Sequence, residues 1–257
     1  QAYNNLGTVL FDRQKNEEAI SHYKVAIKLK PDFALAHNNL GIALVAEGKN
    51  EEAISHYKMA IKLNPDFVKA YNNLGSALFA ERKIEEAIFH YKMAIKIKPD
   101  FADAYNNLGI VLFAKQKIEE AISHYKMAIK IKPDYADAHY NLGNTLRREG
   151  KNSEAISHYK MAIGLKPDYA DAYNNLGIAL VAEGKNEEAI SHYKMAIKLK
   201  PDFAEAHNNL GNALFHAKMT EEAIDYFKEA IRIRPGFAAA QKNLETALRS
   251  MEIQDLF

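Results

Sequence analysis

Apolar and small residues recur along this chain with the three-to-four-residue spacing of amphipathic helices. Between residues 102 and 135, the first such set is Ala104, Leu108, Val111 and Leu112, and the second is Ala121, Tyr125, Ala128 and Ile129. A Lys-rich bend at residues 115–117 separates the sets, and Pro133 ends the second because proline has no amide hydrogen for a further turn. Gly109 leaves room for close approach of the second helix. The pattern predicts a tight antiparallel helix pair.

The same pattern returns at a fixed interval of 34 residues. The interval is kept by the glycines Gly7, Gly41, Gly75, Gly109, Gly143, Gly177 and Gly211, and by the prolines Pro31, Pro65, Pro99, Pro133, Pro167, Pro201 and Pro235. Such a period predicts an array whose units bury apolar surface against their neighbours. We therefore predict seven repeats over residues 1–237. Because Gln241 and Glu245 replace the aromatic residue and the glycine of the next copy, residues 238–257 are predicted to form a capping helix, ending near residue 252, and a tail.

Two local features predict where the helices end. Gly48, Gly150 and Gly184 occupy the bend of three copies, as expected just beyond a helix C-terminus. Asp134 is predicted to cap the helix that follows it, with Asp137 completing an acidic variant of a capping box.

The residues that recur at fixed positions in each copy resemble those of the tetratricopeptide repeat family. The residues that carry the resemblance are Tyr105, Leu108, Gly109, Leu112, Ala121, Tyr125, Ala128 and Pro133, and they recur over nearly the whole chain. His37, His139 and His207 depart from the pattern by replacing the large aromatic residue. The resemblance implies an all-α fold, a right-handed superhelical solenoid of antiparallel helix pairs, whose first helices line a concave groove.

Composition narrows the classes of partner. Lys and Arg total 34 against 33 for Asp and Glu, so the net charge of +1 gives no reason to expect nucleic acid. The longest apolar runs are far shorter than the roughly 20 residues of a membrane span, so we predict no membrane insertion. We expect a cytoplasmic location, although the composition fits a reducing or an oxidising compartment equally well. The absence of cysteine excludes disulfides and thiolate metal sites. Because the chain opens on Gln1 inside the first repeat, we expect it to be a fragment or a processed product.

A row of histidines is the most obvious candidate for metal chemistry. Its members are His22, His56, His90, His124, His158 and His192, and each follows a Glu by four residues. Two side chains at that spacing could share an ion, but no second ligand pair converges within a repeat. We predict half-buried structural imidazoles and no metal site. No nucleophile motif or phosphate loop is found, so neither catalysis nor a cofactor is predicted.

Paired asparagines are the stronger candidate for recognition. The second Asn of each pair lies on the stripe of the residue after the glycine, at Asn39, Asn73, Asn107, Asn141, Asn175 and Asn209. The chain is similar in this to the asparagine-bearing repeats of O-linked N-acetylglucosamine transferase and kinesin light chain, which implies that the amides hold the main chain of an extended peptide. The alternative is a bond to neighbouring backbone. Apolar neighbours predicted in the groove are Ile42, Ile110, Ile178, Phe79, Phe113 and Phe215.

The fifth repeat breaks the pattern. It places Tyr140 where other repeats have Asn, and Asn144, Arg147 and Arg148 where its neighbours have mostly apolar residues. Helical spacing predicts that these side chains share one concave patch that could bind a ligand carboxylate. The alternative is that the arginines only neutralise Asp137, Asp171 and Glu149.

These features favour a non-catalytic protein–protein interaction scaffold that binds an extended peptide or a flexible protein segment in its groove. Two alternatives remain open at this point. The chain could be the substrate-recognition arm of a larger glycosyltransferase of the O-linked N-acetylglucosamine transferase type. It could also be a self-assembling repeat protein that associates through the uncapped end of its first helix.

Overall fold

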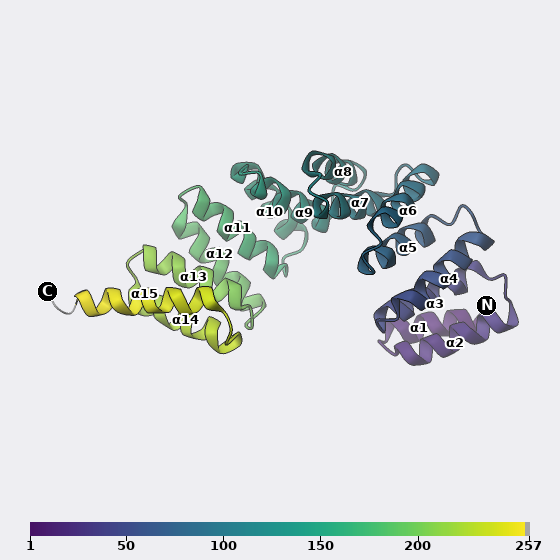
Figure 1. The fold of residues 1–257 in the computed structure, drawn as a ribbon, viewed down its shortest axis with the longest axis horizontal. Helices are drawn as coiled ribbons and strands as arrows, with labels where there is room; N and C mark the ends of the chain where they lie inside the picture. Colours follow the sequence, from purple (N-terminus) through teal and green to yellow (C-terminus); the bar gives the residue numbers. More distant parts are fainter. Residues whose placement is uncertain (255–257) are drawn as a thin grey trace. The chain divides into compact units, whose positions relative to one another are not determined.

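The computed structural model describes residues 1–254 and folds this part of the chain entirely into helices and connecting turns (Figure 1). The helices are α1 (Ala2–Asp12), α2 (Asn16–Leu29), α3 (Ala34–Ala46), α4 (Asn50–Leu63), α5 (Val68–Ala80), α6 (Ile84–Ile97), α7 (Ala102–Ala114), α8 (Ile118–Ile131), α9 (Ala136–Arg148), α10 (Asn152–Leu165), α11 (Ala170–Ala182), α12 (Asn186–Leu199), α13 (Ala204–His216), α14 (Thr220–Ile233) and α15 (Ala238–Gln254). The predicted all-α solenoid of helix pairs is confirmed.

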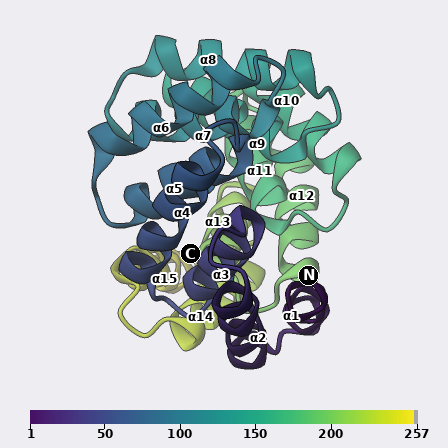
Figure 2. The same cartoon turned by 90° about the vertical axis from the view of Figure 1, so that its right-hand side faces the viewer.

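The chain divides into two compact units, the first ending at Pro133 and the second beginning at Asp134. The first unit holds α1–α8 and the second holds α9–α15. Within the first unit, the pair α3/α4 packs against the next pair, α5/α6, through contacts between α4 and α5 (Figure 2). We number the repeats one to seven along the chain, so that repeat two is α3/α4 and repeat six is α11/α12.

A glycine and a tyrosine fix the distance between the two helices of a pair. A Cβ atom at Gly75 of α5 would lie 2.7 Å from Cε1 of Tyr91 in α6, and one at Gly41 of α3 would lie 2.5 Å from Cε1 of Tyr57 in α4. Both tyrosines are 2% exposed. The predicted close packing is therefore confirmed, and the atoms that need the space belong to the aromatic ring.

The bend between the helices uses the left-handed backbone conformation. Gly48, Gly150 and Gly184 have φ of +72°, +74° and +75°. At the first of these bends the amide of Lys49 donates to the carbonyl of Leu44 at 2.8 Å, which satisfies an otherwise unpaired C-terminal carbonyl. The prediction that these glycines follow a helix C-terminus is confirmed.

The predicted acidic cap is wrong. Helix α9 begins at Ala136 with Tyr135 at its N-cap position, and no side chain makes a capping hydrogen bond there. The turn after Pro133 places the aromatic residue, and not Asp134, at the helix boundary. The carbonyl of Tyr135 then accepts the amide of His139 at 3.1 Å.

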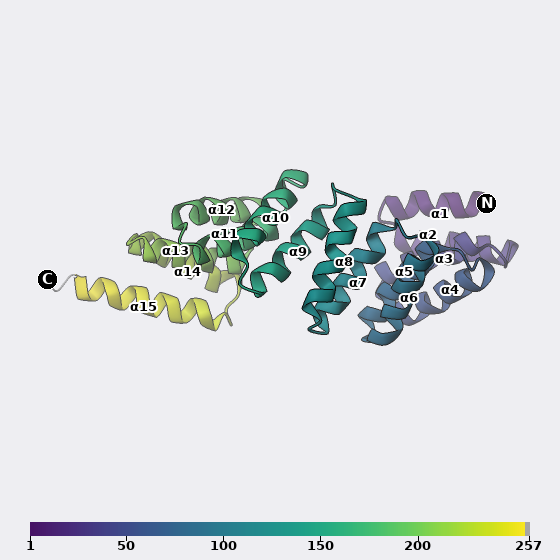
Figure 3. The same cartoon turned by 90° about the horizontal axis from the view of Figure 1, so that it is seen from above.

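The last described helix, α15, packs on α13 and α14 and buries Ala240 and Ala247 (Figure 3). It extends to Gln254, slightly beyond the predicted end near residue 252, while residues 255–257 of the predicted tail lie outside the described residues.

At the other end of the chain, Leu6 of α1 is 45% exposed, whereas its equivalent Leu40 in α3 is fully buried.

Candidate functional site

Within each compact unit, paired asparagines connect neighbouring repeats. The Nδ2 of the second Asn donates to the Oδ1 of the first Asn in the preceding repeat. This bond joins Asn39 to Asn4 at 3.1 Å, Asn73 to Asn38 at 3.0 Å, Asn107 to Asn72 at 3.0 Å, Asn209 to Asn174 at 2.9 Å and Asn243 to Asn208 at 2.9 Å. Neither of the two sequence interpretations anticipated this use of the amides, because it links side chains of different repeats.

The carbonyl oxygens of the same asparagines fall into two groups. In repeats two, four and six the oxygen accepts a bond from the preceding residue. Asn38 donates to Asn39 at 3.4 Å, Asn106 to Asn107 at 3.3 Å and Asn174 to Asn175 at 3.2 Å. The oxygens of Asn73 and Asn209 accept no hydrogen bond from the described residues. These two amides therefore keep an acceptor for another molecule.

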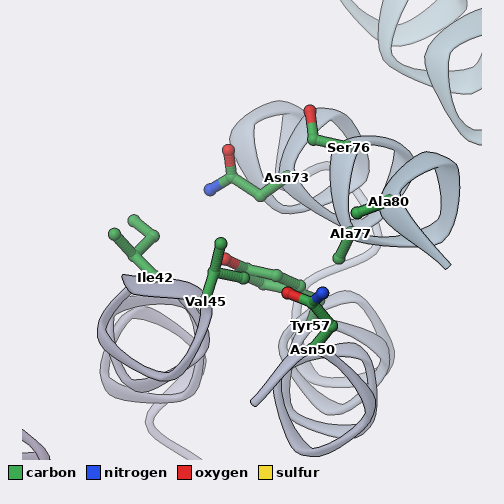
Figure 4. A pocket seen from close by; sticks show the side chains of 8 residues that line it. All are labelled: Ile42, Val45, Asn50, Tyr57, Asn73, Ser76, Ala77 and Ala80. Carbon is green, nitrogen blue, oxygen red and sulfur yellow. The ribbon is translucent and has the colours of Figure 1, made fainter. Parts of the chain in front are cut away.

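Asn73 lines a pocket formed by α3, α4 and α5 (Figure 4). The pocket has a volume of about 230 Å³, and its lining residues are Ile42, Val45, Asn50, Tyr57, Asn73, Ser76, Ala77 and Ala80. Ile42 and Val45 face Ala77 and Ala80 across it, and Tyr57 lies at its base (Figure 4). Asn50 is held by a hydrogen bond of 2.9 Å to Oε1 of Glu81. None of the lining side chains is charged.

The second unit contains a pocket at the equivalent place, between α11, α12 and α13. Its volume is about 350 Å³, and its lining residues are Ile178, Val181, Asn186, Tyr193, Asn209, Asn212, Ala213 and His216. Asn209 takes the place of Asn73, and Tyr193 takes that of Tyr57. The two pockets are built from the same repeat positions, so Asn73 and Asn209 each place an unbonded carbonyl beside an apolar wall.

A tyrosine hydroxyl distinguishes these pockets from other repeat positions. Tyr57 and Tyr193 are each 2% exposed, and neither hydroxyl is bonded to another group in the described part of the chain. Burial raises the pKa of both hydroxyls, so they stay protonated and can donate. From the sequence, the tyrosine at this repeat position is expected only in the core. The signal for an unbonded hydroxyl is the residue after the repeat glycine, which is Ile42 or Ile178 in these repeats and cannot form a hydrogen bond with it.

A broader hollow of about 500 Å³ adjoins the first pocket. It is lined by Leu35, Asn38, Asn39, Ile42, Phe67, Lys69, Asn72, Asn73, Phe101 and Asp103. The structure thus brings together three of the predicted site residues, Asn39, Ile42 and Asn73. Ile178 and Asn209 line the second pocket. Seven further predicted residues lie apart from these pockets, half-buried on the first helices of their repeats: Phe79, Asn107, Ile110 and Phe113 in the first unit, and Asn141, Asn175 and Phe215 in the second.

Some of the unusual side chains of the fifth repeat already form hydrogen bonds within the protein. Oδ1 of Asn144 accepts bonds from Asn175 at 2.8 Å and from Tyr159 at 2.8 Å, and Asn175 also donates to the hydroxyl of Tyr140 at 3.1 Å. Arg147 is half-buried, and its Nε is buried without a hydrogen-bond partner among the described residues. Arg148 is exposed. The predicted patch is therefore a half-buried polar cluster with Arg148 exposed beside it.

The histidine row packs against the aromatic position of its own repeat. The ring centroids of Tyr71 and His90 lie 5.9 Å apart, whereas Nδ1 of His37 lies 3.0 Å from Nδ1 of His56. All six imidazoles are half-buried, as predicted. Across the described residues, no three side chains of the metal-binding types come together.

Acid should weaken the fold through these imidazoles. Burial lowers the pKa of His56, His90, His124 and His192, because it disfavours the charged imidazolium. In the unfolded chain these groups titrate near about pH 6.5. The unfolded state therefore takes up more protons as the pH falls, so stability is full above that value and is lost below it.

We expect a lower urea midpoint at about pH 5.5 than at about pH 7.5, a range in which carboxylates stay largely ionised. Replacing those four histidines by glutamine should flatten the difference. Equal midpoints for the unaltered protein at the two pH values would contradict the prediction.

The stacked helix pairs and the repeated amide contacts define a helical solenoid repeat protein. Profiles of the tetratricopeptide repeat match residues 7–47, 43–81, 75–116, 110–150, 143–184, 179–217 and 204–237. The chain therefore belongs to the tetratricopeptide repeat family. Comparison with curated proteins gave no significant match.

Solved structures of similar fold include a chain of the APC/C hetero-tetramer Cut9–Hcn1, with a TM-score of 0.80 and 20% identity. The alignment covers 96% of this chain and 48% of that one, so the present chain spans about half its length. YrrB, described as a TPR protein with an unusual peptide-binding site, has a TM-score of 0.61 and 25% identity over 72% of this chain and 96% of its own. MamA has a TM-score of 0.56 and 29% identity over 65% and 97%.

None of the helices in the described residues combines the length and the apolar character that crossing a membrane requires.

Proposed function

We propose that this protein is a non-catalytic scaffold that binds an extended peptide, or a flexible segment of another protein, along the first helices of its repeats. The observation that carries the proposal is the unbonded carbonyl of Asn73 beside an uncharged, largely apolar pocket, repeated at Asn209. The similarity to YrrB, a TPR protein described as having an unusual peptide-binding site, supports it.

The chemistry of this surface suits a peptide main chain. An amide oxygen accepts a main-chain N–H whatever the side chains are, so it holds an extended ligand without reading its sequence. Apolar walls beside it supply contact area, because burying apolar surface is favourable and adds little orientation of its own. The inter-repeat bond of Asn73 fixes the direction in which its carbonyl points.

A carboxylate of the ligand would bind at the fifth repeat. Arg147 has a buried Nε that bonds to no described group, and a guanidinium is well suited to pairing with a carboxylate. Tyr140 and Tyr159 border the same cluster, since the hydroxyl of Tyr159 donates to Asn144 and that of Tyr140 accepts from Asn175. The ligand class is thus an extended peptide with an acidic side chain or a free C-terminus.

Two single substitutions separate recognition from stability. Asn73→Ala and Asn39→Ala each remove one inter-repeat hydrogen bond, at 3.0 Å and 3.1 Å, so each should cost on the order of 1 kcal/mol of stability. Of these two asparagines, only Asn73 has an unbonded carbonyl, because that of Asn39 accepts a bond from Asn38. We expect Asn73→Ala to weaken binding of linear peptides selected by phage display about fivefold to tenfold, and Asn39→Ala to leave it nearly unchanged.

Isothermal titration with the selected peptides, together with thermal unfolding of both variants, provides the measurement. Equal losses of affinity in the two variants would show that the asparagines act only through the fold. Failure to select any peptide with the unaltered protein would count against the scaffold itself.

A further inference from the structure

The residue after the repeat glycine alternates between polar and apolar. Along the chain it is Thr8, Ile42, Ser76, Ile110, Asn144, Ile178 and Asn212. The repeat therefore has a second period, of two units, superimposed on the first. Helix formation does not require this alternation, because the position lies on the exposed or half-buried side of the helix in every repeat.

In the repeats with a polar residue and a tyrosine, the two bond to each other. The hydroxyl of Tyr23 donates to Thr8 at 3.3 Å and that of Tyr159 to Asn144 at 2.8 Å, and the hydroxyls of Ser76 and Tyr91 lie 3.0 Å apart. Ile42 and Ile178 cannot make this bond, which leaves Tyr57 and Tyr193 with their hydroxyls in the two pockets.

A second position leaves space above these hydroxyls. Val45 and Val181 occur in the repeats that contain the pockets, where repeats one, three and seven carry Phe11, Phe79 and Phe215. A valine side chain is much shorter than a phenylalanine ring, so the tyrosine stays accessible from the pocket. These repeats thus differ from repeats one, three and seven at two positions, the residue after the glycine and the valine. Both differences leave the tyrosine hydroxyl open to the pocket.

We propose that the pockets above Tyr57 and Tyr193 each take a neutral ligand side chain with an apolar stem and a hydroxyl or amide tip, that of threonine, asparagine or glutamine. The inference rests on the proposed binding of an extended peptide. The tip bonds the tyrosine hydroxyl and the stem contacts the isoleucine and valine wall, while the Asn73 or Asn209 carbonyl holds the main chain of the ligand.

Two costs exclude the other side-chain classes. A purely aliphatic side chain would cover the tyrosine hydroxyl and leave it without any hydrogen-bond partner, which is unfavourable for a buried polar group. A charged side chain would lose its hydration against walls that carry no compensating charge in the first pocket. A neutral polar tip avoids both costs.

The two pockets differ at one edge. Ser76 and Ala80 of the first correspond to Asn212 and His216 of the second. The second pocket therefore has additional donors and more volume, about 350 Å³ against about 230 Å³. We assign the shorter threonine or asparagine side chain to the pocket above Tyr57 and the longer glutamine to the pocket above Tyr193.

The test uses random linear peptides displayed on phage and selected on the full chain. We expect enrichment of threonine, asparagine or glutamine, and a change of that residue to an apolar isostere, such as threonine to valine, should weaken binding about tenfold. Tyr57→Phe removes only the hydroxyl, so it should weaken the same peptide about tenfold and abolish its preference for threonine over valine. Val45→Phe should fill the pocket and have a similar effect. Peptides that occupy the second pocket should respond in the same way to Tyr193→Phe and Val181→Phe.

Tyr91→Phe is the matched control, because its hydroxyl already faces that of Ser76 at 3.0 Å, and it should leave the affinity unchanged. Selection of peptides whose affinity ignores all four pocket substitutions would overturn this inference and leave the scaffold intact. Selection of no peptide at all would overturn both. Equal losses with Tyr57→Phe and Tyr91→Phe would assign the effect to packing and reject the pocket.

Discussion

Replacing Tyr91 by alanine is expected to lower the free energy of unfolding by about 3–5 kcal/mol, the cost of removing a large aromatic side chain from a core. The ring is 2% exposed and fills the space that Gly75 leaves between α5 and α6, where an added Cβ would lie 2.7 Å from Cε1. Alanine would leave a cavity along the contact between the two helices. Urea unfolding followed by circular dichroism gives the measurement.

Tyr91→Phe separates the ring from its hydroxyl. It keeps the aromatic contact and loses only the interaction with Ser76, so its cost should be on the order of 1 kcal/mol. A similar destabilisation by the phenylalanine and alanine variants would show that the hydroxyl, and not the filled volume, holds the helix pair together.

Replacing Arg147 by valine and Arg148 by alanine, the residues of the sixth repeat, should cost about 2–4 kcal/mol of binding to peptides that carry a carboxylate. The Nε of Arg147 is buried without a hydrogen-bond partner among the described residues, which is costly in the free protein, so the same change should leave the fold as stable or slightly more stable. Loss of binding with unchanged or increased stability is the combination that a ligand role predicts.

Affinity for acid-bearing peptides selected on the chain, measured at low and high salt, tests this prediction. The salt dependence should flatten in the variant, because a charged pair has been removed. Replacing Arg13 and Arg82 by asparagine removes the same charge at two exposed turns and should change the affinity little. Unaltered affinity in the Arg147 and Arg148 variant at low salt would eliminate the carboxylate site.

The helix pairs were predictable because their signals are local. Apolar spacing of three to four residues and a proline after the second helix act within a single repeat, and each repeat supplies this evidence again; three repeats add a glycine at the bend. The partner of Gly109 was less obvious. Sequence reasoning predicted close packing there, and the structure shows the ring of Tyr125 in that space.

The amide contacts were not predictable from one repeat. Asn73 bonds to Asn38, 35 residues earlier, and this pairing depends on how one repeat stacks on the next. The stacking decides which amide atoms remain unbonded. The sequence pattern alone therefore does not distinguish one second asparagine from another. In repeats three and seven, the oxygens of Asn73 and Asn209 accept no hydrogen bond from the described residues.

The fifth repeat shows the same limit. Helical spacing correctly placed Tyr140, Asn144 and Arg147 on neighbouring turns, but it could not show that Asn144 bonds to Asn175 of the next repeat. The capping prediction for Asp134 failed for a related reason, because the turn geometry moved the helix boundary to Tyr135. The first error concerns a contact between repeats, and the second concerns the local geometry of a turn.

A crystal structure of the chain with a phage-selected peptide tests the central claim most directly. We predict that a main-chain N–H of the peptide donates to Oδ1 of Asn73 or Asn209, and that the peptide runs along the first helices of the repeats beside Ile42 or Ile178. A peptide bound instead to the second helices, with both asparagine oxygens still free of ligand, would contradict the proposed function.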